Sequence, residues 1–168
     1  MPLPGDFGLV SITGTVGRLT RIGQWLNGDG YRDYEHAFIV LNNHGLLEAE
    51  PGGARLRELT EYDGTNVIYS DWPLTNQQRD QIVETALSLV GTPYSILDYL
   101  SLVLVRLHIR PGWVARYVAN TGHMICSQLV DNCYQRTGVH LFDDGRLPGD
   151  VTPGDLSTVL YAARKMEG

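Results

Sequence analysis

Three side chains that are distant from one another in the sequence could together form an activated cysteine nucleophile. Cys126 supplies a thiol, His36 a base, and Glu48 a carboxylate that could orient the base. A thiol becomes a strong nucleophile when an imidazole takes its proton, and a carboxylate can hold that imidazole in the productive orientation. These residue types predict attack on an acyl carbonyl by Cys126, with His36 as general base and Glu48 as the orienting residue.

Cys126 is expected at the first position of a helix. Residues 126–136 carry apolar side chains at helical spacing and are followed by Gly138, a residue type that commonly ends helices. In a first helical turn, the helix dipole and the free backbone N–H groups lower the pKa of a thiol and can stabilise an oxyanion. A helical cysteine is otherwise often a small apolar core residue, which is the role expected for Cys133.

His36 and Glu48 lie twelve residues apart, on either side of a predicted β-hairpin. Residues 37–41 and 46–49 favour strands, and the Asn-Asn-His-Gly sequence between them is typical of a turn. Because side chains alternate between the faces of a strand, the loop length decides whether the two residues share a face. A three-residue loop ending in a left-handed Gly45 would bring them together, whereas a two-residue loop would separate them.

Other polar residues have weaker claims to a catalytic or metal-binding role. Glu50 has the same parity as Glu48 and is the alternative orienting residue. His123 lies three residues before Cys126, where it could be a second base or only a loop residue. A zinc site made from His123, Cys126 and Cys133 would have unsuitable spacing and no clear fourth ligand. We therefore expect no metal and no organic cofactor.

Length and composition predict one domain that covers residues 1–168. The chain has 168 residues, of which 43% are hydrophobic, and this is enough for a core. The formal net charge is −6 and the basic residues are scattered, so nucleic acid is not an expected partner. The longest apolar run, residues 99–109, is shorter than the about 20 residues that a membrane-spanning helix needs.

The compartment expected from the sequence is the cytoplasm, at least at synthesis. Residues 1–10 lack the basic and apolar regions of a secretory signal. Cys126 and Cys133 lie seven residues apart in one predicted helix, too far along its axis to form a disulfide. We therefore expect a reduced, soluble protein; the sequence leaves its oligomeric state open.

The remaining pattern predicts the α+β class, with an antiparallel sheet and helices segregated on it. Beyond the hairpin, the expected elements are strands at residues 5–12 and 67–72, helices from 75 to 91 and from 96 to 108, and a turn-rich tail at 147–163. Thr75 followed by Gln78 has the capping-box pattern of a helix start, and Gly91 is the expected end of that helix.

Taken together, these motifs resemble the NlpC-type cell-wall peptidases of the papain-like superfamily, in their circularly permuted form. Four segments carry the resemblance: Cys126-Ser127-Gln128-Leu129-Val130 with Tyr134 and Gly138 after it, Gly91-Thr92-Pro93-Tyr94, residues 36–49, and Pro4-Gly5-Asp6. The family usually places its cysteine before its histidine; here the order is reversed, as in the permuted members and in lecithin–retinol acyltransferase-like enzymes. The chain departs from the family pattern at Gln128, in lacking an acidic residue immediately before Cys126, and in the long segment 95–125.

The resemblance implies a permuted papain-like fold, in which an antiparallel sheet or small barrel packs against helices and the nucleophile lies at a helix N-terminus. It also implies a peptidase or amidase with a Cys126, His36 and Glu48 triad. Tyr94 and Ser127 become the candidates for stabilising the oxyanion or binding substrate. The implied substrate is an amide bond of a peptidoglycan stem peptide, in a bacterial or phage context. A phage protein without a signal would reach the wall during lysis or in the virion.

Two other functions remain open at the level of the sequence. Residues 96–105 form an apolar stretch whose simpler interpretation is a core helix. An apolar wall beside the active site would instead suit a lipid acyl chain, and with it ester or thioester hydrolysis or acyl transfer. The last alternative is a non-catalytic binding or structural module that retains the fold.

Overall fold

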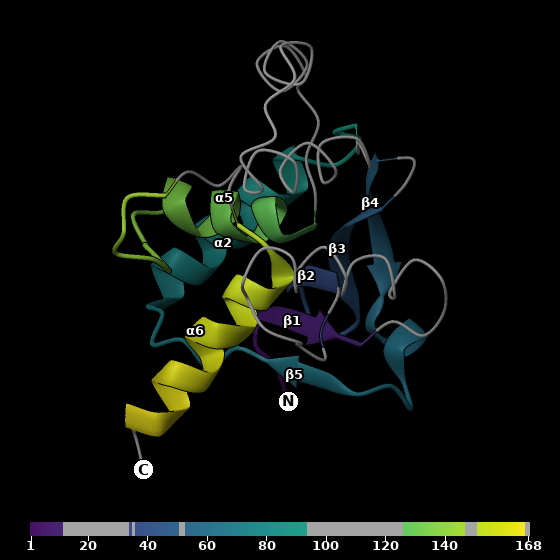
Figure 1. Ribbon diagram of the computed structural model, residues 1–168. Helices are drawn as coiled ribbons and strands as arrows, with labels where there is room; N and C mark the ends of the chain where they lie inside the picture. The colour runs from purple at the N-terminus through teal and green to yellow at the C-terminus, as the bar shows by residue number, and fades with distance from the viewer. Residues whose placement is uncertain (12–33, 35, 51–52, 94–125, 147–150, 167–168) are drawn as a thin grey trace, which may run out of the picture.

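Five strands form one antiparallel sheet in the computed structural model, which describes residues 1–11, 34, 36–50, 53–93, 126–146 and 151–166 (Figure 1). The strands are β1 (Phe7–Val10), β2 (His36–Val40), β3 (Gly45–Glu50), β4 (Gly53–Glu58) and β5 (Val67–Tyr69), in the spatial order β4-β3-β2-β1-β5. The helices are α2 (Asn76–Ser88), α5 (Cys126–Arg136) and α6 (Pro153–Met166), with a short 3-10 helix η1 (Leu59–Tyr62). The predicted α+β class is confirmed. Within the described residues the sheet is open, with β4 and β5 at its edges, and does not close into a barrel.

The register of the β2–β3 hairpin places His36 and Glu48 on one face, although the predicted loop ending in Gly45 is replaced by residues 41–44, with Gly45 already in β3. Its register pairs Phe38 with Glu48 and Val40 with Leu46, so residues of equal parity face each other. The loop is stabilised by Asn42, whose Oδ1 accepts hydrogen bonds from the N–H groups of His44 at 2.9 Å and Gly45 at 2.7 Å. The expectation of a left-handed Gly45 was wrong: its φ is not positive, because this side-chain turn at Asn42 reverses the chain instead.

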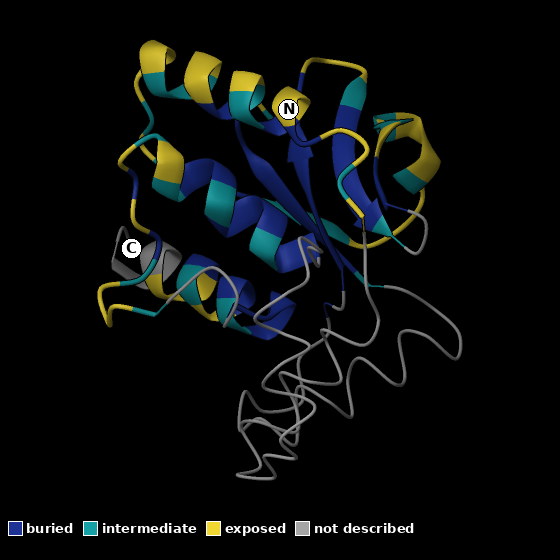
Figure 2. Cartoon of the chain, turned by 90° about the horizontal axis from the view of Figure 1, so that it is seen from above, coloured by how far each residue is buried: buried dark blue, intermediate teal, exposed yellow. Residues whose placement is uncertain are grey.

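The two faces of the sheet bury different clusters. Odd-numbered residues of β1, β2 and β3, such as Leu9, Ile39 and Leu47, pack with the helices in the main core. Even-numbered residues form a smaller cluster on the opposite face: Val10, Phe38, Val40 and Leu46, with the partly buried Leu59, Tyr62, Val67 and Tyr69 against them. Figure 2 shows the strands mainly dark blue, as expected for a sheet that is covered on both faces.

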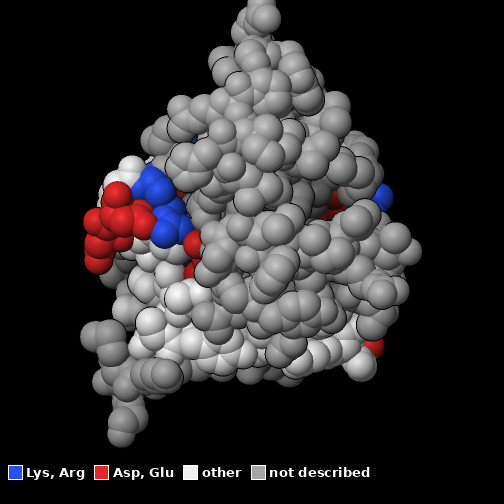
Figure 3. Space-filling view, in the orientation of Figure 1, with Lys and Arg blue, Asp and Glu red and all other residues white. Residues whose placement is uncertain are grey.

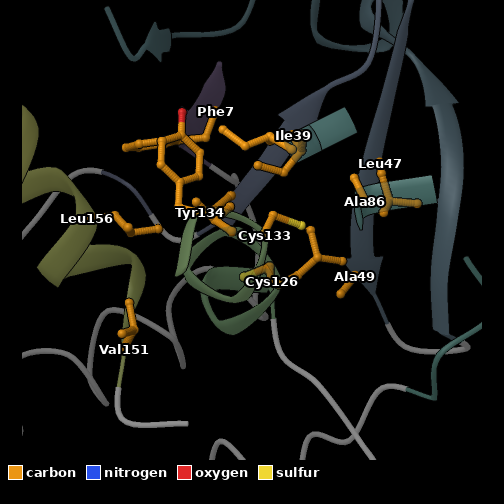
Figure 4. Close-up of a cluster of buried hydrophobic side chains, with 14 of the residues drawn as sticks. Phe7, Ile39, Leu47, Ala49, Ala86, Cys126, Cys133, Tyr134, Val151 and Leu156 are labelled. Atoms are coloured by element: carbon orange, nitrogen blue, oxygen red, sulfur yellow. The ribbon is translucent and has the colours of Figure 1, made fainter. Parts of the chain in front are cut away.

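Helix α5 is the element that crosses the sheet most closely, and it packs on β2, β3 and α2. Most of its residues are buried, and they include both cysteines, as Figure 4 shows. The helix ends as predicted before Gly138, which has a positive φ of 76°. Helix α2 begins with the predicted capping box between Thr75 and Gln78, but it ends at Ser88, before Gly91.

The Pro-Gly-Asp turn before β1 is tied to both of these helices. Gly5 has a φ of 85°, a conformation that a glycine adopts without strain. Its carbonyl accepts a hydrogen bond of 2.8 Å from the Tyr134 hydroxyl of α5. Asp6 is buried and forms a 2.8 Å ion pair with Arg79 of α2. The turn therefore fixes β1 relative to α2 and α5.

Three elements, β4, η1 and α6, were not predicted from the sequence, and others were shorter than predicted. The edge strand β4 was not predicted, because its exposed residues interrupt any simple apolar alternation. The turn-rich interpretation of residues 147–163 was wrong for α6. Thr152 caps this helix: its Oγ1 accepts from the Asp155 N–H at 3.1 Å, while Asp155 Oδ2 accepts from the Thr152 N–H at 2.9 Å. The helix predicted at 96–108 lies outside the described residues.

On the face shown in Figure 3, basic side chains lie beside acidic ones. None of the described helices combines the length and the apolar character that crossing a membrane requires.

Candidate active site

The predicted nucleophile and base both lie at the first residue of their elements. Helix α5 begins at Cys126 and strand β2 begins at His36. Both side chains are buried, with exposed fractions of 6% for Cys126 and 4% for His36. The imidazole and the thiol are hydrogen-bonded to each other. The structure thus brings together two residues that are ninety positions apart in the sequence.

His36 contacts the predicted carboxylate through one ring nitrogen. Its Nε2 lies 3.0 Å from Oε2 of Glu48. Glu48 is only 1% exposed and pairs with Phe38, two residues beyond His36 on β2. The alternative residue, Glu50, forms an ion pair with Arg55. Glu48 is therefore the carboxylate that holds the imidazole.

The thiol reaches His36 near the end of the β2–β3 ladder rather than across one face of the sheet. His36 shares its face with Phe38, whereas α5 packs against the opposite face, which carries Ala37 and Ile39. The β2–β3 register ends at the pair Phe38 and Glu48. The next N–H along β2, that of Ala37, is directed at the sulfur of Cys126, as is the N–H of Ser127. The backbone of β2 therefore contributes a hydrogen-bond donor to the thiolate.

The two titratable groups stabilise each other's charged form. Burial alone would raise the pKa of Cys126, but the charge and hydrogen bond of His36 and the two backbone N–H groups lower it overall. Burial likewise opposes the imidazolium of His36, yet the Cys126 thiolate and Glu48 together raise its pKa to about 9. This is the pattern of a thiolate–imidazolium pair, the reactive state of a cysteine nucleophile.

Glu48 has two further donors that the sequence analysis did not identify. Its Oε2 accepts a hydrogen bond of 2.5 Å from the Tyr62 hydroxyl, and its Oε1 accepts one of 3.2 Å from Nε of Arg57. Burial would raise the pKa of Glu48, but His36, Tyr62 and Arg57 lower it overall, so the carboxylate is ionised. Tyr62 ends η1 and Arg57 lies on β4, and neither element was predicted.

Other sequence candidates have different surroundings. The Ser127 hydroxyl is fully buried and donates to the Val151 carbonyl at 2.7 Å, so its side chain links α5 to the segment before α6. Tyr94 lies outside the described residues. Cys133 packs in the core, where burial raises the pKa of its thiol to about 12, and Figure 4 shows it among apolar side chains. The two cysteines are therefore chemically distinct.

A metal-ligating geometry exists among the described residues only where His36, Glu48 and Glu50 meet. One potential ligand atom from each lies within 4.8 Å of the others. Both carboxylates are already paired, Glu48 with His36 and Arg57, and Glu50 with Arg55. A cation would have to compete with these arginines, so the donor set fits an ionic network better than a dedicated metal site.

Comparison with known proteins gives this chain no family assignment. No family model matches it, and no curated protein matches it either. The geometry of the site and the sequence motifs are therefore the grounds for a functional proposal.

Proposed function

We propose that this chain is a cysteine hydrolase in which Cys126 is the nucleophile, His36 the general base and acid, and Glu48 the orienting carboxylate. The observation that carries the proposal is the buried contact of these three side chains. In it the pKa of Cys126 is lowered and that of His36 is raised to about 9. Cys133 shows the opposite effect, because burial raises the pKa of its thiol to about 12.

The reaction begins with attack of the Cys126 thiolate on the carbonyl carbon of the substrate. The new carbon–sulfur bond moves the carbonyl π electrons onto oxygen, and the N–H of Cys126, at the start of α5, would bind this oxyanion. Collapse of the tetrahedral intermediate breaks the carbon–nitrogen bond, and the leaving nitrogen takes the proton of the His36 imidazolium. A thioester remains on Cys126.

Water completes the cycle. It attacks the thioester carbon and gives a proton to His36, and the second intermediate collapses to a carboxylic acid and the Cys126 thiolate. Throughout, Glu48 holds His36 through Nε2 and stabilises its positive charge. These steps need no group beyond water and the residues of this chain.

The fold within this proposal is a circularly permuted papain-like domain. Its support is the chain order, in which the histidine strand β2 and the glutamate strand β3 precede the nucleophile helix α5. His36 and Glu48 lie on adjacent antiparallel strands, and Cys126 lies at the start of a helix. Both features agree with the motifs that resemble NlpC-type peptidases. By the same resemblance, the proposed substrate is an amide bond in a peptidoglycan stem peptide.

One sequence observation favours a second candidate function. The apolar stretch at residues 96–105 would suit an acyl chain, which makes lipid ester or thioester hydrolysis, or acyl transfer, the alternative chemistry for the same nucleophile.

The test is incubation of the purified chain with purified peptidoglycan and, separately, with a panel of fatty acyl esters and thioesters. Cys126→Ser is the inactive control and Cys133→Ser the matched control for loss of a thiol. We expect new amino groups to be released from peptidoglycan by the wild type and by Cys133→Ser, and none by Cys126→Ser. Release of fatty acid instead would support the lipid alternative. Activity in neither assay, together with an ordinary thiol at Cys126, would indicate a non-catalytic module.

A further inference from the structure

Both carboxylate oxygens of Glu48 accept hydrogen bonds, and Tyr62 donates to the same oxygen that His36 contacts. Oε2 accepts from both His36 Nε2, at 3.0 Å, and the Tyr62 hydroxyl, at 2.5 Å, whereas Arg57 binds Oε1 at 3.2 Å. We propose that Tyr62 is a positioning residue of the reaction, which acts through Glu48 to keep the imidazolium of His36 oriented and charged. This inference rests on the proposed function of the Cys126 site.

The ring of Tyr62 is fixed by its own segment and by a parallel stack. Tyr62 ends η1, and its carbonyl accepts hydrogen bonds from the Thr65 N–H at 3.0 Å and the Thr65 hydroxyl at 2.6 Å. Its ring lies on that of Phe38, with centroids 5.1 Å apart and planes only 5° from parallel. The hydroxyl therefore points at Glu48 from a ring that cannot rotate freely.

Phe38 is in turn held by the sheet. It pairs directly with Glu48 on β3 and with Gly8 on β1. Its ring occupies the space above Gly8, where an added Cβ would lie 2.2 Å from Cζ. Gly8, Phe38, Tyr62 and Glu48 thus form a continuous contact chain from the centre of the sheet to the carboxylate. Such rigid support is what a reactive site needs to keep its geometry.

The chemistry of a tyrosine suits this position. Glu48 is almost completely buried, so protein donors must replace the water that would otherwise stabilise its charge. A neutral hydroxyl satisfies Oε2 without cancelling the negative charge that His36 requires, whereas a second cation on this oxygen would weaken it. Burial and the neighbouring carboxylate raise the pKa of Tyr62, which therefore remains a hydrogen-bond donor over the working pH range.

The experiment compares the pH dependence of Cys126 alkylation by iodoacetamide in the wild type, Tyr62→Phe and Tyr69→Phe, with labelling located by mass spectrometry. Tyr62→Phe keeps the stack on Phe38 and removes only the hydroxyl. Tyr69 is the matched control, because its ring meets the same Phe38 ring edge-on at 6.1 Å, whereas the hydroxyl that donates to Glu48 Oε2 belongs to Tyr62. Urea midpoints of all three proteins establish that each is folded.

We expect the acidic limb of the Tyr62→Phe profile to move upward, by at most the about one pH unit that one hydrogen bond to a charged group can contribute. The reason is that Glu48, without this donor, would hold its negative charge less well and support the imidazolium of His36, and through it the Cys126 thiolate, less strongly. Tyr69→Phe should follow the wild type. If the wild-type thiol reacts at lower pH than an ordinary thiol and Tyr62→Phe gives the same profile, the role of Tyr62 is overturned but the proposed function stands. A wild-type profile typical of an ordinary thiol would overturn both.

Discussion

Replacement of Gly8 by alanine should destabilise the protein because the new methyl group has no room. The Cβ would lie 2.2, 2.6 and 2.9 Å from three atoms of the Phe38 ring, whereas carbon atoms normally approach to about 3.5 Å. Phe38 is fully buried and stacked against Tyr62, so its ring would have to move by roughly 1 Å within a packed cluster. Overpacking of this kind costs about 1–3 kcal/mol, which exceeds the about 0.4–1 kcal/mol gained when alanine restricts the unfolded chain.

The assay is urea denaturation of Gly8→Ala, Phe38→Leu and the double variant, with Gly45→Ala as control. The three atoms nearest to an added Cβ at Gly45 all belong to the exposed side chain of Asn42, the closest at 3.3 Å, so its effect should stay within about 0.5 kcal/mol. Leucine at position 38 makes room for the methyl group, so the double variant should be more stable than the sum of the single effects by about 1 kcal/mol. Equal effects of Gly8→Ala and Gly45→Ala, or strictly additive effects in the double variant, would refute the steric argument.

Four further outcomes follow from the site and its supports. Cys126→Ser should abolish hydrolysis, whereas Cys133→Ser should retain it, and equal losses in the two variants would contradict their different environments. Glu48→Gln should lower the rate on the order of 10²-fold, less than loss of the nucleophile; an unchanged rate would exclude Glu48 from the triad. Hydrolysis measured against pH should fall as pH rises through about 9, because His36 then loses the proton that the leaving group needs; a rate that stays constant there would argue against His36 as the acid. Asp6→Asn should lower the free energy of unfolding by about 2–3 kcal/mol, because it leaves the largely buried Arg79 without its ion-pair partner, and urea titration would show whether it does.

The parts of the site that depend on local pattern could be predicted from the sequence. The face shared by His36 and Glu48 depends on the two-residue period of a strand and on the length of one loop; the sequence supplied the period but left two loop lengths open, and the register decides between them. The start of α5 at Cys126 and its end before Gly138 followed from helical spacing and a glycine stop signal. The conformation of Gly45 could not be derived in this way, because the Asn42 side chain offered a competing turn.

The supporting residues could not be predicted, because their contacts are not local. Tyr62 contacts Glu48 because β4 and η1 bring the chain back beside β3. The sequence of β4 resembles a polar segment, since its residues at the sheet edge are largely exposed. Helix α6 was missed for a different reason. Pro-Gly-Asp at residues 153–155 suggested a turn, although a proline in the first helical position after a capping threonine is also a helix-start signal.

The most direct test of the catalytic proposal is the titration of Cys126 itself, followed by the ultraviolet absorbance of its thiolate. The signal is the difference between the protein and its Cys126→Ser variant, and it does not require a reagent to reach the buried sulfur. We expect the thiolate to be present well below the ordinary thiol pKa, and His36→Ala to move the titration back up. A thiol that titrates at or above its ordinary value in the wild type, with no effect of His36→Ala, would contradict the proposal that this site is an activated cysteine nucleophile.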